Sequence, residues 1–344
     1  MCQCIEEGMP MMIREQMENR EMTYLSPYAA LSKNSKGRAV KEAECDVRTV
    51  FQRDRDRILH SKAFRRLKQK TQVFLLPLGD HYRTRLTHTL EVSQNARTIA
   101  KALCLNEELV EAIALGHDLG HTPFGHAGER ALANICSKGF EHNEQSVRVV
   151  EHLEKDGKGL NLTWEVIDGI RNHQTSGNPS TLEGKVVRLS DKIAYLNHDV
   201  DDAIRGGILQ EEEIPKEIRE VLGNGLKPRL NTLIHDVITQ SMGQPDIVMS
   251  EEVHKAMMDL RKFMFSHVYQ NSIAKREEEK AIHMIEKMYD YYIHDIDQLP
   301  ESFRESIDMG ESKETAVCDY IAGMTDNYAV QKFADIFVPQ SWKN

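Results

Sequence analysis

Apolar residues recur at steps of three and four along most of this chain, and this spacing restricts the possible fold more than any other feature of the sequence. Residues three and four positions apart lie on one face of an α-helix, so the spacing predicts amphipathic helices that bury that face. One long stripe consists of Leu189, Ile193, Leu196, Val200 and Ile204. Extended structure is indicated only at 71–76, where a proline follows. From residue 46 onward the sequence therefore predicts an all-α fold.

Composition divides the chain into parts. Residues 1–23 are polar, rich in methionine and glutamate, and lack an apolar period, which predicts a flexible tail. Residues 24–43 are rich in proline, serine, lysine and glycine, and we expect a loop there. The glycine pair at 206–207 is predicted to end a long helix. We therefore expect one helical part at 24–205 and a helical C-terminal region at 206–344, which can belong to the same domain.

Further helix boundaries follow from local signals. Thr122 and Pro123 are expected to begin a helix, directly after Gly120 ends the previous one. In the C-terminal region, helices are predicted at 253–269 and 275–293. The sequence does not indicate a purpose for these later helices.

Charge and hydropathy exclude some classes of protein. The 344 residues include 44 Lys and Arg against 54 Asp and Glu, a formal net charge of -10. An acidic chain is a poor candidate for coating nucleic acid, which requires a basic face. No run of eighteen apolar residues predicts a membrane span, and the N-terminus lacks the basic start and apolar stretch of a signal peptide. We expect a cytoplasmic protein without a membrane partner.

The cysteines are scattered and no secretion signal accompanies them, so a disulfide framework is not expected. We predict structural or incidental thiols at Cys2, Cys4, Cys45, Cys104, Cys136 and Cys318.

The strongest chemical signal is a set of separated polar residues: His88, the adjacent pair His117 and Asp118, and Asp191. Two imidazoles and two carboxylates form a mixed nitrogen and oxygen ligand set that suits one divalent ion, Mn²⁺, Mg²⁺, Fe²⁺ or Zn²⁺. His117 follows Ile113 by four residues and therefore shares its core-facing side.

A single histidine is more often a satisfied core or surface side chain than a metal ligand, and fifteen histidines are available. The segment HDLGHTPFGH changes this balance, because it places three histidines and an aspartate in ten positions between apolar helices. Buried polar groups must find partners, and a metal ion satisfies them together. We therefore predict a metal site.

Three longer motifs carry a resemblance to a known family. They are FQRDRDRILHSKAFRRLKQKTQVF at 51–74, RTRLTHTLEVSQNAR from Arg83 and GHDLGHTPFGHAGE from Gly116. The chain resembles, over about residues 24–205, the deoxyguanosine triphosphate triphosphohydrolase family of HD phosphohydrolases. The resemblance implies an HD-type helical bundle as the catalytic core, with additional C-terminal helices, and it is weaker after Gly206.

The same resemblance implies roles for individual residues. It makes His88, His117, Asp118 and Asp191 the metal ligands. It gives His126 the role of catalytic histidine with Glu129 as its acidic neighbour, places His121 against the phosphates and makes His142 a second histidine of the site. Similarity to a vertebrate dNTP-hydrolysing relative places the substrate around Gln72, Arg85, Lys192, Tyr195 and Asp199, the first and last of these near the deoxyribose.

In the family, a deoxynucleoside triphosphate is cut into deoxynucleoside and tripolyphosphate. The leaving 5′ oxygen then needs a proton, and His126 is the predicted donor because histidine titrates near neutral pH. Glu129 lies three residues further along the expected helix, on the same face, where it can orient the imidazole. A surface pair of the same spacing would be the simpler interpretation without the metal motif beside it.

Other functions stay open at this point. The four ligands alone also fit an HD phosphatase or phosphodiesterase acting on other nucleotides. A third reading is a nucleotide sensor or single-stranded nucleic-acid binder, and the basic stretch at 53–70 can face phosphate, although RDRDR can also neutralise itself. The resemblance further implies a homo-oligomer and, in some members, an effector dNTP.

Overall fold

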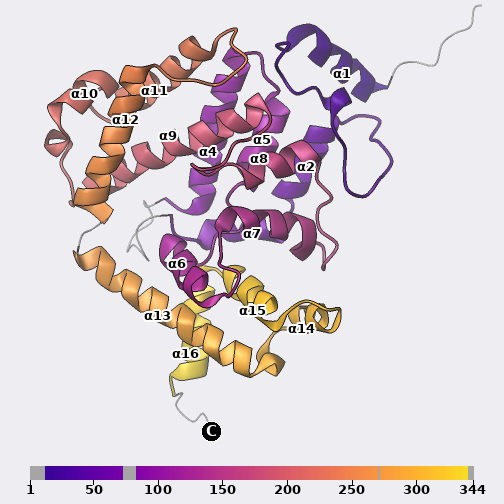
Figure 1. The fold of residues 1–344 in the computed structure, drawn as a ribbon, viewed down its shortest axis with the longest axis vertical. Coiled ribbons are helices and arrows are strands. Elements are labelled where there is room, and N and C mark those ends of the chain that lie inside the picture. The colour runs from indigo at the N-terminus through magenta and orange to yellow at the C-terminus, as the bar shows by residue number, and fades with distance from the viewer. Residues whose placement is uncertain (1–11, 73–82, 270–271, 340–344) are drawn as a thin grey trace, which may run out of the picture.

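The computed structural model describes residues 12–72, 83–269 and 272–339, and within these ranges every regular element is a helix (Figure 1). Extended pairing there is limited to two isolated bridges, Arg38 with Thr163 and Thr71 with Thr84. The predicted all-α fold is confirmed. The expected extended segment at 71–76 lies mostly outside the described residues.

The helices of the first half are α1 Ile13–Tyr24, α2 Val50–Leu59, α3 Lys62–Arg66, α4 Arg85–Ala102, α5 Glu107–Gly116, α6 Gly125–Ile135, α7 His142–Arg148, α8 Trp164–Arg171 and α9 Leu182–Arg205. Those of the second half are α10 Lys216–Leu222, α11 Leu226–Ser241, α12 Glu251–Met264, α13 Ser272–His294, α14 Glu301–Asp308, α15 Lys313–Ala322 and α16 Asp326–Phe337. Short 3₁₀ turns lie at Ser32–Asn34, Leu67–Gln69, Glu211–Glu213 and Ile296–Gln298, and π-helical turns at Val149–Leu153 and Phe265–Tyr269.

Helix α5 is the centre of the larger apolar core. It packs against α2, α4, α8 and α9. Apart from one face with Glu107, Glu108 and Glu111, its side chains are apolar, and Leu109, Val110 and Ile113 are fully buried, as expected for a helix packed against several others. The Asn106 side chain caps its first turn by accepting from the backbone N–H groups of Glu108 and Leu109. The end of α5 therefore lies deep in the molecule.

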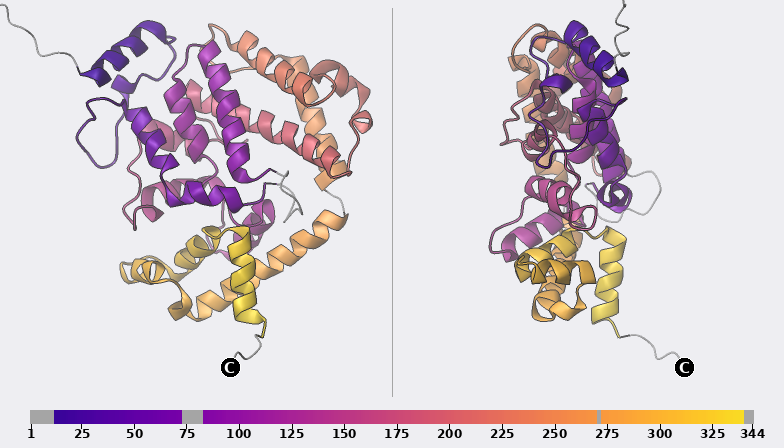
Figure 2. Two further views of the ribbon diagram at one scale, coloured as in Figure 1. Left: turned by 180° about the vertical axis from the view of Figure 1, so that it is seen from behind. Right: turned by 90° about the vertical axis from the view of Figure 1, so that its right-hand side faces the viewer.

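A second apolar cluster is separate from this core. It joins Phe124 and α6 to the C-terminal helices, with Leu132 of α6 packing among Ile285 and Met288 of α13 and Ile321 of α15. In Figures 1 and 2, α13 to α16 form the lower part of the molecule, and α6 lies between them and the upper helices. Helices α10 to α12 follow the predicted boundary at residue 206 yet contribute to the first cluster.

Three local predictions need correction. The expected tail contains α1, which is held to the body because Arg14 N–H donates to the Asp46 carbonyl at 3.0 Å and the side chain of Glu18 is buried. The helix expected at Thr122 begins at Gly125, because Phe124 takes a left-handed conformation (φ 63°) that no α-helix continues.

The third correction concerns the cysteines. Cys136 at the end of α6 and Cys318 in α15 form a disulfide, although the sequence predicted thiols at both positions. The two residues are 182 positions apart, and they come together because α6 and α15 both pack against α13. Cys45 and Cys104 are free, and Cys2 and Cys4 lie outside the described residues.

Half of the basic residues in the stretch at 53–70 pair with carboxylates, namely Arg53, Arg55, Arg57 and Lys62. Arg55 contacts Glu108 at 2.6 Å, and Arg57 contacts Glu42 at 2.6 Å. Lys70 is buried, and its ammonium group donates hydrogen bonds to backbone carbonyls in the interior. In the described part of the chain, no helix is both long enough and apolar enough to span a membrane.

Candidate metal centre

The four residues predicted as metal ligands converge at the inner end of α5. His117 ends α5 and Asp118 follows it, while α4 contributes His88 and α9 contributes Asp191. Nε2 of His88 lies 3.1 Å from Oδ1 of Asp191 and 3.9 Å from Oδ2 of Asp118. Nε2 of His117 lies 3.3 Å from Oδ1 of Asp118 and 3.8 Å from Oδ1 of Asp191.

These separations fit one divalent ion. Around an ion with bonds of about 2.1 Å, adjacent ligand atoms lie about 3 Å apart and opposite ones about 4 Å apart. The two carboxylates also supply the negative charge that a divalent cation requires. Three of the four residues, His88, His117 and Asp118, are buried and lie close enough together to hold an ion.

The hydrogen bonds of His117 leave one nitrogen for a ligand. Its Nδ1 lies 2.6 Å from the carbonyl of Ala114, which can only accept, so Nδ1 carries the proton. Nε2 then has a free lone pair, is buried and has no hydrogen-bond partner. A backbone carbonyl that fixes the tautomer in this way is the usual support of a metal-binding histidine. The residues present therefore fit a metal ion.

Beside this centre, Glu129, His142 and His173 form a hydrogen-bonded row. Nδ1 of His142 lies 2.8 Å from the Glu129 carboxylate, and its Nε2 lies 3.1 Å from Nε2 of His173. Nδ1 of His173 donates to the carbonyl of Ile170 at 2.7 Å, so its Nε2 accepts. His142 thus donates through both nitrogens and carries a positive charge.

The pKa shifts agree with this assignment. Burial lowers the pKa of His142, but the hydrogen bond and charge of Glu129 outweigh it, so that the pKa is raised. For Glu129, burial raises the pKa, and the hydrogen bonds of His126 and His142 bring it far below its ordinary value. Burial lowers the pKa of His173 to about 4, which keeps that imidazole neutral at neutral pH.

His121 links this row to the metal centre. Its ring stacks on His142 with centroids 4.0 Å apart, and its Nε2 lies 3.2 Å from Oδ1 of Asp118. Burial, followed by the positive charges of Arg85 and His142, holds its pKa well below the usual value. Nη1 of Arg85 donates to Oδ2 of Asp118 at 2.9 Å.

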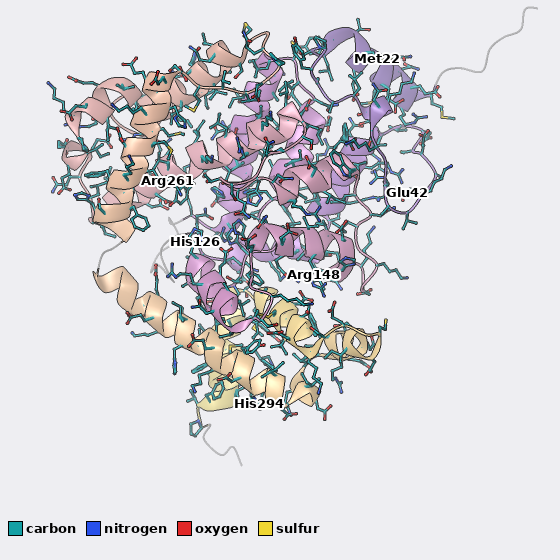
Figure 3. All side chains as sticks on the ribbon, viewed as in Figure 1. Met22, Glu42, His126, Arg148, Arg261 and His294 are labelled. Atoms are coloured by element: carbon teal, nitrogen blue, oxygen red, sulfur yellow. A yellow bond between two sulfur atoms is a disulfide. The ribbon has the colours of Figure 1, made fainter. Side chains whose placement is uncertain are left out.

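His126 differs from the other histidines because it is exposed. It is the second residue of α6, 60% of its side chain is accessible, and its Nδ1 lies 3.5 Å from Glu129. Glu129 is therefore closer to His142 than to the residue it was predicted to orient. Figure 3 labels His126 at the beginning of α6.

A single cavity contains most of the predicted site. Its wall includes His173 and ten of the predicted residues, which are Gln72, Arg85, His88, Asp118, His121, His126, His142, Asp191, Lys192 and Tyr195. Glu129 supports this wall through its two histidines. Asp199 is buried in α9 and does not form part of the cavity wall, so its contact with a deoxyribose stays a prediction.

Several residues of the cavity were not anticipated. His173 lies in the polar segment NHQTSG, directly after a helix with an apolar face. As in HDLGHTPFGH, several polar residues close together beside a buried helix could have indicated that this histidine belongs to the site. Met257, Met258 and Arg261 reach the cavity from α12, on which Figure 3 labels Arg261. Nothing in the sequence of α12 indicates this, because its approach to α9 depends on tertiary packing.

Comparison with known proteins agrees with this architecture. The HD domain model matches residues 85–196, and the phosphohydrolase-associated domain model matches residues 247–335. A deoxyguanosinetriphosphate triphosphohydrolase-like protein of Caldanaerobacter subterraneus subsp. tengcongensis is 59% identical over 332 residues, covering 96% of this chain and 98% of the relative. A protein of the same description from Clostridium tetani is 48% identical, covering 96% and 97%.

Among solved structures, a phosphohydrolase from Bacteroides thetaiotaomicron superposes with a TM-score of 0.53 at 16% identity, covering 81% of this chain and 67% of that one. This likeness concerns the fold alone. The sequence relatives extend over almost the full length of both chains, and they confirm the predicted resemblance. The chain belongs to the deoxyguanosinetriphosphate triphosphohydrolase-like family of HD-domain phosphohydrolases.

Proposed function

We propose that this protein hydrolyses deoxynucleoside triphosphates to deoxynucleoside and tripolyphosphate, with dGTP as one candidate substrate. The observation that carries the proposal is the arrangement of cations around the metal centre. Arg85, Lys192 and Arg261 line the cavity that contains the ligands. One end of this cavity can bind an ion, and its walls are positively charged, as a polyphosphate requires.

The charges near Lys192 support an anionic ligand. Burial lowers its pKa, and the positive charges of Arg188 and Arg261 lower it further. Within the described residues, neither Lys192 nor Arg261 forms a salt bridge. A bound triphosphate would neutralise this repulsion, and it would lie between α9 and α12.

The reaction adds water to the α-phosphorus and breaks its bond to the 5′ oxygen. A divalent ion held by His88, His117, Asp118 and Asp191 would supply charge to the phosphate and acidify water. His126 lies at the cavity wall and donates the proton that the leaving 5′ oxygen needs. The cationic His142, held by Glu129 and His173, adds a fixed positive charge to the same wall. Tyr195 and Gln72 offer polar contacts to the nucleoside.

The test is product analysis with each of the four dNTPs in the presence of Mn²⁺ or Mg²⁺, with and without a second dNTP as effector. Tripolyphosphate in equal amount to deoxynucleoside supports the proposal. In H₂¹⁸O the label should enter tripolyphosphate and not the deoxynucleoside, because the α-phosphorus is attacked. Release of pyrophosphate or of single phosphates would contradict the proposal and favour a different HD phosphohydrolase activity.

A further inference from the structure

Three distant segments of the chain meet at a buried junction beside the cavity. We define the junction by six residues: Lys70, Thr71, His121, Phe124, Ala322 and Asp326. The first two precede α4, the next two belong to the segment between α5 and α6, and the last two end α15 and begin α16. The junction therefore connects the metal-binding core, the segment leading to His126 and the C-terminal helices.

Asp326 is the acceptor at this junction. Its Oδ2 accepts from Thr71 N–H at 2.9 Å and from the Thr71 hydroxyl, and its Oδ1 accepts from Phe124 N–H at 3.0 Å. Only 3% of the residue is exposed. Both carboxylate oxygens are needed, because loss of either leaves a buried donor without a partner, at a cost of about 1–3 kcal/mol.

Lys70 is the donor at the junction. Its Nζ donates to the carbonyl of His121 and, at 2.8 Å, to the carbonyl of Ala322, and only 2% of the residue is exposed. Its backbone carbonyl accepts from Arg85 N–H at 3.0 Å. The same lysine therefore contacts the metal-binding core, the segment before α6 and the end of α15.

The junction fixes a turn with an unusual backbone. Phe124 (φ 63°) and Gly125 (φ 55°) are both left-handed, and only the glycine adopts this conformation freely. A β-carbon on Gly125 would approach Arg85 Nη2 to 3.2 Å and the Gln72 carbonyl to 3.3 Å, so the turn lies directly against the cavity wall. His126 follows immediately. The hydrogen bond from Phe124 N–H to Asp326 thus holds the residue from which α6 starts.

Helix α6 packs on the C-terminal cluster, whereas the metal ligands belong to elements of the first core. The position of His126 relative to those ligands therefore depends on how the two clusters are joined. Asp326 and Lys70 form buried polar links across that boundary, and the disulfide from Cys136 to Cys318 ties the far end of α6 to α15.

We propose that Asp326 is a positioning residue, which holds the turn at Phe124 so that His126 faces the scissile bond, with Lys70 as its counterpart on the core side. The inference rests on the proposed function for the role of His126. It assigns a catalytic purpose to the C-terminal helices, which contribute no metal ligand.

The test compares Asp326→Asn with Asp335→Asn, an exposed carboxylate on the same helix. An asparagine offers one oxygen where two are used, so Thr71 or Phe124 loses its acceptor. We expect kcat for the dNTP to fall between about tenfold and a hundredfold, the cost of a misplaced catalytic group. KM should change less than about twofold, and metal content should not change. Thr71→Val removes only the hydroxyl that donates to Asp326, so it should reduce kcat by a smaller factor. It is the variant to use if Asp326→Asn does not fold.

A double-mutant cycle separates positioning from general damage. In a His126→Ala background, Asp326→Asn should cause no further loss of kcat, because the group it positions is already absent. Full additivity of the two losses would overturn the proposal, as would equal losses in Asp335→Asn and Asp326→Asn.

Amide hydrogen exchange in the metal-free protein supplies a readout independent of turnover. Peptides covering 122–132 should exchange faster in Asp326→Asn than in wild type, and Asp335→Asn should not differ from wild type. Unchanged exchange at 122–132 would overturn the junction itself. If wild type released no tripolyphosphate while this exchange difference was present, the proposed function would fail and the junction would stand.

Discussion

At the scale of single residues, the partner of each ring nitrogen decides what a histidine of this site can do. His117 gives one nitrogen to a backbone carbonyl and keeps a lone pair for a metal ion. His142 donates through both nitrogens and is a cation. His126 is exposed to the cavity and to solvent, and its Nδ1 lies 3.5 Å from the Glu129 carboxylate. We therefore propose that residues of one type serve here as metal ligand, fixed charge and proton donor.

These differences predict separable effects of substitution. Asp191→Ala should abolish both bound metal and turnover, because it removes an anionic ligand from the centre. His126→Ala should retain the metal and reduce kcat by about 10²–10⁴-fold, the usual contribution of proton transfer. Metal analysis together with steady-state kinetics measures both, with His254→Ala on the surface of α12 as control. Unaltered turnover in His126→Ala would contradict its role.

A second prediction concerns pH. Glu183 accepts from the backbone N–H groups of Ala30 and Asn106, but burial raises its pKa to about 7. The folded state then binds a proton more tightly than the unfolded state, so this group's contribution to stability falls as pH rises from about 4.5 to 7. Glu183→Gln, which stays neutral, should gain stability over wild type by roughly 1 kcal/mol per pH unit in that window.

Chemical denaturation at several pH values measures this difference. The exposed substitution Glu212→Gln should show no such trend, and a Glu183→Gln difference that is constant with pH would contradict the prediction.

At the scale of elements, the ends of helices build the site. The segment after α5 presents Asp118 and His121, and it lies directly against the first turns of α7, which presents His142. Gly120 makes this approach possible, because a β-carbon there would lie 2.2 Å from the backbone nitrogen of Ser146 and 2.5 Å from the His142 carbonyl. Such distances cannot be relieved by a side-chain movement.

Gly120→Ala should therefore separate α5 from α7 and reduce the free energy of unfolding by more than about 1–3 kcal/mol, the range for overpacked cores. Metal affinity should fall with it, since Asp118 and His121 are displaced. Gly206→Ala, at the end of α9 where the nearest atom is 3.2 Å away, is the control and should cost less. Denaturation and metal titration measure the two effects, and a fully stable Gly120→Ala protein would contradict the packing described.

At the scale of the whole molecule, helices that pack in two different apolar clusters contribute residues to the same cavity. The ligands come from the first cluster, and α6 with His126 is carried by the second. Because the predicted ligands come from α4, α9 and the end of α5, a bound ion should link these helices and stabilise the fold.

Removal of metal by a chelator should thus lower the melting temperature, by roughly 4 °C for an ion present at a hundred times its dissociation constant. Addition of Mn²⁺ should restore it. The same treatments should leave the melting temperature of Asp191→Ala unchanged, and a metal-dependent shift in that variant would place the ion elsewhere. Differential scanning calorimetry provides the measurement.

Local sequence signals predicted the all-α class, the end of α9, the boundaries of α12 and α13 to within a few residues, and the residue types of the candidate metal site. These features follow from the local spacing of apolar residues and from the chemistry of imidazole and carboxylate groups, and both can be read directly from the amino-acid sequence. It also indicated the family, because its motifs are long and in the right order.

Only the docking of whole elements brings α6 and α15 onto α13, pairs Cys136 with Cys318, and places Arg261 and Asp326 beside residues that are distant in the sequence. Helix α1 was missed because its polar surface has little apolar period and it is held by contacts with distant segments. Contacts of this kind depend on how whole elements dock, and the free energy of docking is spread over many side chains that no local pattern identifies.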